Sequence, residues 1–366
     1  MNGVSADPLR PAFGRVVLFR GQSGFTVDDV MTFSWFLGEL RTPWSELMEA
    51  IALEAFASES GFELDDEALT SMSEEFRYER ELLTVEEIER WLAARDLTED
   101  DFNNYLVRRY WRANPPEGVK SEQSEEANYL EASPELQELL RADLLLSGRF
   151  DRLAREVSWR LVLPEQGEIS PQSLEAERAR FFERTALDQQ SVINALKQLG
   201  RDAEWLEQCL SLEVRYQQLC EVLLTDEARA NTLTAQRLPL TRIKIEMLTL
   251  RSRDAAQEAV LCLREKLLSP DQLAKECRTE WESQEFFLGD CEADVQQEFL
   301  SAAPGEVLAP KPYEDSFVVS RIESKTEPDL ADPRIRTRID RRLLRGHFSE
   351  LTSKSIRWVL GDSMPH

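Results

Sequence analysis

Histidine is almost missing from this sequence, because His347 and His366 are the only two among 366 residues. A Ser-His-Asp triad, a Cys-His dyad or a His-ligated metal site would have to use His347, which lies in an arginine-rich stretch predicted to be helical. The sequence therefore disfavours histidine-based catalysis and indicates neither a metal ion nor a cofactor.

Cysteine is sparse as well, and the cysteines that occur are odd in number and contain no CxxC pair: Cys209, Cys220, Cys262, Cys277 and Cys291. This pattern favours idle thiols in a reducing compartment over a zinc ribbon or a disulfide framework. The N-terminal residues hold no apolar stretch of signal-peptide length, and no run approaches the roughly 18 apolar residues of a spanning helix. We therefore expect a cytoplasmic protein without membrane insertion.

Positive charge is in short supply. Lysine and arginine number 44 against 69 acidic residues, and 44 − 69 gives a net charge of −25. This excess disfavours nucleic acid as a partner. The acidic clusters Glu125-Glu126 and Asp65-Asp66-Glu67 lack the alternating ligand spacing of a calcium loop, so we expect them to be solvated surface.

Glycine is scarce too, with 14 residues, while glutamate, leucine, arginine and alanine dominate, which is typical of a mainly helical chain. Three threonines, Thr26, Thr84 and Thr98, each have an acidic residue three positions later. This spacing predicts helix starts with a capping box. We expect helices over residues 44–58, 65–81, 84–95, 98–111 and 134–161.

An internal repeat appears when the sequence is aligned with itself at an offset of 105 residues. Gly61 and Gly167 precede the two copies, and one residue is lost before Phe102 and Leu106, which fall on Leu206 and Leu210. Chance periodicity is the alternative, but the matches extend over three helices and favour duplication of a helical module. The apolar matches are Leu64 with Ile169, Leu69 with Leu174, Phe76 with Phe181, Leu82 with Leu187, Ile88 with Ile193 and Trp91 with Leu196.

The pattern of apolar and charged residues changes after residue 238. Ile243, Ile245 and Met247 alternate with charged residues, which predicts a strand, and two helical stretches over 252–267 and 269–277 follow. A short apolar run at 286–289, a helix over 294–302 and a strand over 316–322 complete a β-α-α-β-α-β order. The fold class we predict is mainly α with one small α+β domain built on an antiparallel sheet.

These observations divide the chain into five parts. The order is a first helical module, a polar linker, a second helical module that repeats the first, the α+β domain and a closing helix. Their expected ranges are 1–112, 113–133, 134–237, 238–326 and 327–366.

Three segments resemble known families. Residues 48–76 and 82–112, MEAIALEAFASESGFELDDEALTSMSEEF and LLTVEEIERWLAARDLTEDDFNNYLVRRYWR, resemble the N-terminal helical domain of SurA-type chaperones. Residues 242–324 resemble a parvulin peptidyl-prolyl isomerase domain, most specifically in PGEV at 304–307 and FVVSRIE at 317–323. The tail DPRIRTRIDRRLLRGHFSELTSKSIRWVL resembles the helix that returns to pack on the helical modules in such proteins.

The resemblance also implies where the parvulin chemistry would lie. Of the two core histidines of that family, the first falls on Glu246 or Met247 and the second on Phe317. The position held by a cysteine or aspartate falls near Thr279 and Glu280, where Glu280 would keep a carboxylate. Both histidines are absent, so the resemblance indicates a degenerate parvulin domain.

Six residues are candidates for peptide binding, and two of them, Met247 and Glu280, are also the candidates for residual catalysis. Aromatic rings and methionine give adaptable apolar contacts for an extended segment. For Met247 and Phe317 we favour the alternative that they belong to the core of a small domain. The peptide-binding candidates are Met247, Glu280, Phe286, Phe287, Phe299 and Phe317.

The closing helix is rich in arginine, which allows two interpretations. The first is that the helix is an arm that binds nucleic acid. Docking on the protein's own acidic modules is the one we favour, because apolar residues at helical spacing, such as Ile335 and Ile339, interleave with the arginines. The arginines are Arg334, Arg336, Arg338, Arg341, Arg342 and Arg345, and the candidate partners are Glu81, Glu86, Glu87, Glu89, Asp100 and Asp101.

We therefore predict a peptide-binding, chaperone-like protein that holds unfolded or precursor polypeptides. Two alternatives stay open. The first is an active peptidyl-prolyl isomerase that accelerates folding without histidine, since rotation about an X-Pro bond breaks no covalent bond. The other is a non-catalytic adaptor in a peptide maturation or export system, which would bind one protein partner tightly.

Overall fold

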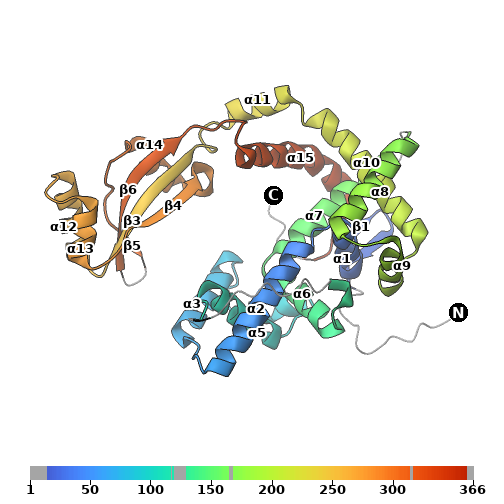
Figure 1. Ribbon diagram of the computed structural model, residues 1–366, viewed down its shortest axis with the longest axis horizontal. Coiled ribbons are helices and arrows are strands. Elements are labelled where there is room, and N and C mark those ends of the chain that lie inside the picture. Colours follow the sequence, from blue (N-terminus) through green and yellow to red (C-terminus); the bar gives the residue numbers. More distant parts are fainter. Residues whose placement is uncertain (1–14, 117, 119–128, 165–167, 314–315, 361–366) are drawn as a thin grey trace. The chain divides into compact units, whose positions relative to one another are not determined.

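The computed structural model describes residues 15–116, 118, 129–164, 168–313 and 316–360. These fall into two compact units, residues 1–219 with 348–366 (unit 1) and residues 220–347 (unit 2), shown in Figure 1. Helices predominate, beside small antiparallel sheets, which confirms the predicted fold class. Most of the expected linker 113–133, as well as Gly167 and His366, lies outside the described residues.

Unit 1 combines a small sheet with most of the helices. Two helices, α10 (Ala203–Leu223) and α15 (Pro333–Ser355), contribute residues to both units. The other elements of unit 1 are β1 (Val16–Arg20), β2 (Ser23–Thr26), α1 (Val27–Phe36), α2 (Arg41–Ser60), α3 (Asp66–Glu79), α4 (Val85–Ala93), α5 (Glu99–Ala113), η1 (Tyr129–Glu131), α6 (Pro134–Leu146), α7 (Arg149–Leu161), α8 (Pro171–Thr185), α9 (Gln189–Gln198) and β7 (Ile356–Trp358).

Unit 2 is built on a four-stranded sheet. Its elements are α11 (Asp226–Ala235), β3 (Arg242–Leu250), α12 (Arg253–Arg264), α13 (Pro270–Cys277), β4 (Glu282–Phe287), η2 (Leu288–Asp290), α14 (Ala293–Ser301), β5 (Lys311–Tyr313) and β6 (Ser316–Thr326). Among the helices that the structure describes in the two units, none is long and apolar enough to cross a bilayer.

The three predicted capping boxes are confirmed. Thr26, Thr84 and Thr98 are the N-caps of α1, α4 and α5. In each, the threonine hydroxyl accepts from the backbone N–H three residues on, and the acidic side chain there accepts from the threonine N–H. Each box satisfies two backbone donors that a helix start otherwise leaves unpaired, which is why the local sequence suffices to place these starts.

The repeat corresponds to α3–α5 and α8–α10, but the expected alignment of its second helix is wrong by one residue. The N-caps Asp65 and Ser170 lie 105 residues apart, whereas Thr84 and Asp188 lie 104 apart. The lost residue therefore belongs to the turn before α4 and α9, one helix earlier than the sequence suggested.

Burial explains the corrected alignment. Ile193, expected to match the half-buried Ile88, is 41% exposed, while its neighbour Val192 is 3% exposed. Leu196 matches the buried Leu92 in place of Trp91. Neighbouring apolar residues on a helix point to different faces, so the sequence pattern left the register of α9 ambiguous.

The two copies share one hydrophobic core. Phe76 of the first copy and Phe181 of the second are both fully buried in the same cluster of apolar side chains. Phe76 packs 4.8 Å from Phe102, and Phe181 stacks at 5.3 Å on Phe36 of α1 (ring centroid distances). A shared core means that the helical repeats pack as parts of a single unit.

The single helix expected over 134–161 is in fact two helices. Gly148, between α6 and α7, has a φ of 72°, in the left-handed region that glycine enters without steric cost. The apolar pattern continues across this turn, with Leu146 and Phe150 both buried, so periodicity alone concealed the break.

The predicted closing helix is present, but it ends earlier than the sequence suggested. Helix α15 stops at Ser355, and residues 356–358 form β7, which pairs antiparallel with β1 in the order β2-β1-β7. Near the end of α15, the fully buried Phe348 stacks on Trp159 with ring centroids 5.2 Å apart. The last described residues thus belong to the fold of unit 1 through a strand pairing between sequence-distant residues.

A buried carboxylate organises α8. Glu177 is 0% exposed, and its Oε1 accepts at 2.7 Å from Arg184 while its Oε2 accepts from Arg180 at 3.0 Å and Gln217 at 2.7 Å. Arg184 Nε in turn donates to the carbonyl of Phe36 at 2.9 Å. The network links α8, α10 and α1, and each hydrogen bond compensates part of the cost of burying the charge.

Replacing Glu177 by alanine should therefore destabilise unit 1 by about 3–5 kcal/mol, because Arg184 would stay partly buried without its partner. The matched control is Glu175→Ala, since Glu175 lies on the same helix with its side chain 77% exposed and should change stability by less than about 0.5 kcal/mol. Urea unfolding followed by tryptophan fluorescence measures both. Equal midpoints for the two variants would contradict the structural role of Glu177.

Candidate functional site

The sheet of unit 2 carries the peptide-binding candidates. Its strand order is β4-β3-β6-β5, with every neighbouring pair antiparallel. The predicted order of elements is present, with β5 as an unpredicted edge strand and β4 starting at Glu282, four residues before the apolar run that predicted it. That run misplaced the strand because the first four residues of β4 are polar and exposed.

Strand β3 sends its side chains alternately to the two faces. Ile243, Ile245 and Met247 pack on the face covered by α14, whereas Leu248 and Leu250 pack under α12 and α13. Helix α14 thus covers one face of the sheet at the start of β3, and α12 and α13 cover the other face at its end. The reason is that the apolar residues of β3 point to one face up to residue 247 and to the other from residue 248.

Three of the six predicted residues meet on the α14 face. Met247, Phe286 and Phe299 belong to one apolar cluster, in which the rings of Phe286 and Phe299 lie 5.2 Å apart at 49°. Phe299 is 7% exposed and anchors α14, while Met247 is half-buried at the rim of the cluster. Met247 and Phe286, which is also half-buried, therefore both contact the core and stay partly open to solvent.

The other three lie elsewhere, so the six residues do not line one groove. Phe317 packs on the opposite face with Leu250. Phe287 packs against α15, where the guanidinium carbon of Arg338 lies 4.0 Å from its ring centroid. Glu280 is exposed in the connection between α13 and β4.

Charged pairs occupy the rest of the face that carries Phe317. Glu246, one of the two positions matched to a parvulin histidine, is on this face and binds Arg321. Lys244 donates to Glu323 at 2.8 Å, and this hydrogen bond raises the pKa of Lys244. The face is a ladder of ion pairs, so Glu246 is engaged on the side of the sheet away from Met247.

The arginines of α15 also find partners in unit 2. Arg334 donates to Glu285 at 2.9 Å, and Arg338 makes two hydrogen bonds to Asp290 at 2.9 and 2.6 Å. Ile339 is buried, as expected. The helix therefore docks through both charge and apolar contact, but these two arginines bind the sheet domain instead of the expected acids of residues 81–101, because the N-terminal half of α15 packs beside β4.

An uncovered surface extends beyond α14 on its side of the sheet. Register places Ser320 and Glu282 on either side of Met247, Val318 beside Thr249, and Gln284 beside Ile245. We call this surface the open face. It consists of the half-buried Met247, Val318 and Ser320 and the exposed Thr249, Glu282 and Gln284.

The sequence pattern did not identify Glu282 as a residue of the open face. The resemblance placed a carboxylate at Glu280, but the strand register puts the Glu282 backbone opposite Met247. The signal that could have found it is the alternation of β4 itself, since Phe286, Gln284 and Glu282 share a face.

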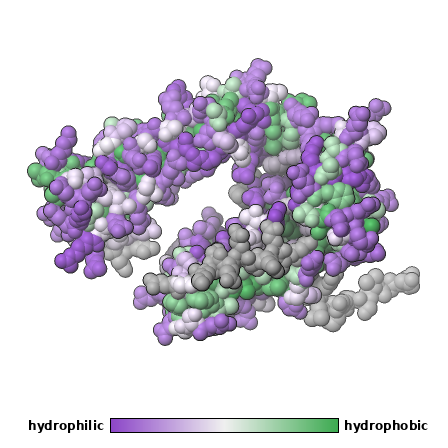
Figure 2. Space-filling view, viewed as in Figure 1, coloured by the Kyte–Doolittle hydropathy of each residue, from purple (hydrophilic) through white to green (hydrophobic). Residues whose placement is uncertain are grey.

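Strand β4 is an edge strand. It pairs with β3 on one side and with no other strand of the described chain, and its residues Glu282–Glu285 are exposed. An exposed edge offers unpaired backbone donors and acceptors to an extended segment. In Figure 2 the visible surface of unit 2 is mostly hydrophilic, with apolar side chains at the α12–α13 end, where Leu261 and Leu267 are exposed.

Nucleophilic and metal chemistry find no support in the described part of unit 2. No disulfide joins any two of the five cysteines, and burial raises the pKa of Cys277 and Cys291, which keeps both as thiols. Within the described ranges, no cluster of three or more histidine, cysteine or acidic residues is arranged to hold a metal ion.

No family model and no curated protein matches this chain. Solved structures similar to it include a peptidylprolyl isomerase, PrsA, from Bacillus anthracis, with 13% identity and a TM-score of 0.28 over 54% of this chain and 96% of that one. PrsA from Bacillus cereus has 11% identity and a TM-score of 0.33 over 62% and 88%.

A third similar structure comes from work on PEB4 and Cj1289, two SurA-like chaperones of Campylobacter jejuni, with 8% identity and a TM-score of 0.20 over 58% of this chain and 87% of that one. These structures are of the same kinds, SurA-like chaperones and parvulin-type isomerases, as the families that the sequence resembles. Because the identities and TM-scores are low, we infer function from the geometry of the chain itself.

Truncating Phe299 and truncating Met247 should lower the stability of unit 2 by different amounts, because Phe299 is buried and Met247 is only half-buried. Phe299→Ala should destabilise unit 2 by about 3–5 kcal/mol, because it leaves a cavity between α14 and the sheet. Met247→Ala should cost about 1–2 kcal/mol, because Met247 is only half-buried. Denaturant unfolding monitored by circular dichroism compares them, and a larger loss for Met247→Ala would show that Met247 is a core residue and no part of an accessible site.

Proposed function

We propose that this protein binds extended polypeptide segments on unit 2 and acts as a chaperone-like holder of unfolded or precursor chains. The observation that carries the proposal is the exposed edge strand β4 beside the open face. A peptide that adds a strand to an edge gains main-chain hydrogen bonds whatever its sequence, and the neighbouring surface then selects among side chains.

The composition of the open face supports this mode of binding. Met247 and Val318 offer apolar contact, while Thr249, Ser320 and Gln284 offer hydrogen-bonding groups. Methionine in particular adapts to differently shaped partners. Such a mixed surface suits clients that share little sequence, as a holder of unfolded chains requires.

Charge adds a preference among clients. Glu282 lies on the open face, and the chain as a whole carries a net charge of −25. A negative field attracts basic segments and repels acidic ones. The preferred client is therefore an extended apolar segment flanked by lysine or arginine.

The cytosolic location and the domain boundaries drawn from the sequence belong to the same proposal. The five cysteines form no disulfide with one another, which supports a reducing compartment, where thiols persist. The clients would accordingly be newly made or precursor chains of the same compartment.

Placing a positive charge on the open face should weaken client binding. Val318→Lys is expected to weaken binding of a labelled, basic, apolar peptide at least tenfold, because lysine removes apolar contact and repels the client. Leu261→Lys makes the same chemical change at a 59% exposed position of α12 and should leave binding unaltered. Fluorescence anisotropy gives the affinities, and suppression of the aggregation of a denatured protein gives the chaperone effect.

The same samples separate the alternatives. Acceleration of cis-to-trans isomerisation of a proline peptide, lost in Met247→Ala and Glu280→Ala, would replace the holder with a histidine-free isomerase. Binding of a single partner without suppression of aggregation would indicate an adaptor. If Val318→Lys and Leu261→Lys behaved alike in every assay, the open face would not be the binding surface.

A further inference from the structure

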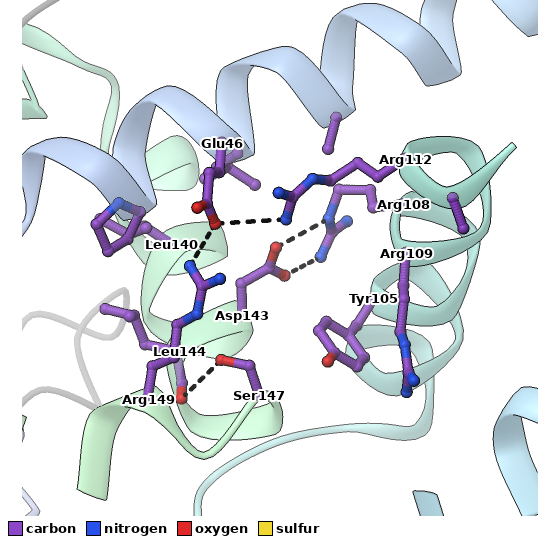
Figure 3. A pocket seen from close by; sticks show the side chains of 14 residues that line it. Glu46, Tyr105, Arg108, Arg109, Arg112, Leu140, Asp143, Leu144, Ser147 and Arg149 are labelled. Carbon is purple, nitrogen blue, oxygen red and sulfur yellow. Dashed lines mark hydrogen bonds and ion pairs between the residues drawn. The ribbon is translucent and has the colours of Figure 1, made fainter. Parts of the chain in front are cut away.

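A cavity in unit 1 is lined by an excess of arginine. It measures about 370 Å³ and lies among α2, α5, α6 and the start of α7 (Figure 3). That volume falls within the range of roughly 300–1,000 Å³ found for small-ligand sites. Among the described residues, four arginines and two acids line it, so 4 − 2 gives these groups a charge of +2 in a protein whose net charge is −25.

One of these arginines has a structural role. Arg108 donates from Nη2 to Asp143 at 2.5 Å and from Nε at 3.4 Å, and its side chain is 4% exposed. Burial raises the pKa of Asp143, although the hydrogen bond from Arg108 opposes this effect. The pair joins α5 to α6 and forms the inner wall of the cavity.

The outer pair of arginines is undercompensated. Glu46 Oε2 binds Nη1 of Arg149 and lies 3.4 Å from Nη1 of Arg112, so two guanidinium groups share one carboxylate oxygen. Both arginine side chains are 40% exposed and converge on Glu46 from different helices (Figure 3). Each guanidinium carries five N–H donors, of which a single shared acceptor atom engages few.

The fourth arginine, Arg109, adds another positive charge to the cavity lining. Arg109 donates to Glu75 at 2.8 Å, and Glu75 lies outside the cavity lining. In Figure 3 the Arg109 side chain points away from Glu46. Its acidic partner therefore adds no negative group to the cavity wall.

The floor of the cavity is apolar. Pro43, Leu47, Leu140 and Leu144 line it, together with the ring of Tyr105, whose pKa burial raises. A ligand that fits must combine a negative, forked acceptor with a small apolar group. The planar guanidinium fork matches a carboxylate with two parallel hydrogen bonds, and the lining already shows that match once, between Arg108 and Asp143.

We propose that this cavity is a binding site for a carboxylate attached to a small apolar group, held between Arg112 and Arg149 above the leucine floor. In a polypeptide, such a group occurs as the free C-terminus of a chain that ends in an apolar residue, and as an acidic side chain with an apolar neighbour. The site lies wholly in unit 1 and does not rest on the function proposed for unit 2.

The test uses three acetylated tetrapeptides and the full chain, with binding measured by calorimetry at low salt. The first ends in leucine with a free carboxylate, the second is its C-terminal amide, and the third is an amide that contains one glutamate. The free-acid peptide should bind at least tenfold more tightly than its amide, since charge-assisted hydrogen bonds are lost with the carboxylate. Tight binding of the third peptide would assign the site to acidic side chains as well as to chain ends.

Variants identify the cavity as the place of binding. Arg149→Gln and Arg112→Gln should each weaken the free-acid peptide about tenfold or more, and added salt should weaken it further. Arg152→Gln is the matched control, because Arg152 lies on α7 outside the cavity with its side chain 50% exposed and should leave the affinity unchanged. Circular dichroism melting verifies that each variant is folded.

Three results would overturn the proposal. They are equal affinities for the free acid and the amide, unaltered binding in both Arg149→Gln and Arg112→Gln, and stronger binding of inorganic phosphate than of the free-acid peptide. The first two would remove the carboxylate or the cavity from the interaction, and the third would make the site one for phosphate.

Discussion

The alternation of a single strand, β3, determines the layout of unit 2. Its apolar residues point to one face up to Met247 and to the other from Leu248 onward. Helices can bury apolar surface only where the strand presents it, so α14 covers one end of one face and α12 and α13 cover the opposite end of the other. The open face and the ion-pair ladder are the two surfaces that this arrangement leaves without a helix.

Unit 1 shows how charge is used inside a protein with a large acidic excess. Glu177 is fully buried and accepts hydrogen bonds from two arginines of α8 and a glutamine of α10, and the buried Arg108 of α5 pairs with Asp143 of α6. In both places, groups from different helices converge on one charge, because an isolated ion in a protein interior is costly. The same logic explains the cavity, where Arg112 and Arg149 share Glu46 and keep donors available at a half-exposed position.

Part of the clustering of the candidate residues could be anticipated, and the residues that were misplaced share one cause. Met247, Phe286 and Phe299 come together as the aromatic pattern suggested. Phe317 and Phe287 do not join them, because their places depend on register and on the docking of α15. A residue's face in a sheet changes with a shift of one position, so resemblance placed the carboxylate at Glu280 while the register places Glu282 opposite Met247.

The sequence alone determined the features that depend on neighbours within a few residues. These are the capping boxes at Thr26, Thr84 and Thr98, the helical repeat and the order β3-α12-α13-β4-α14-β6 in unit 2, since local hydrogen bonds and periodicity specify them. Tertiary structure decided the pairing of β7 with β1, the shared core of the repeats and the arginine-lined cavity. Each of these brings together residues far apart in the chain, and which distant groups meet depends on how all the apolar faces pack at once.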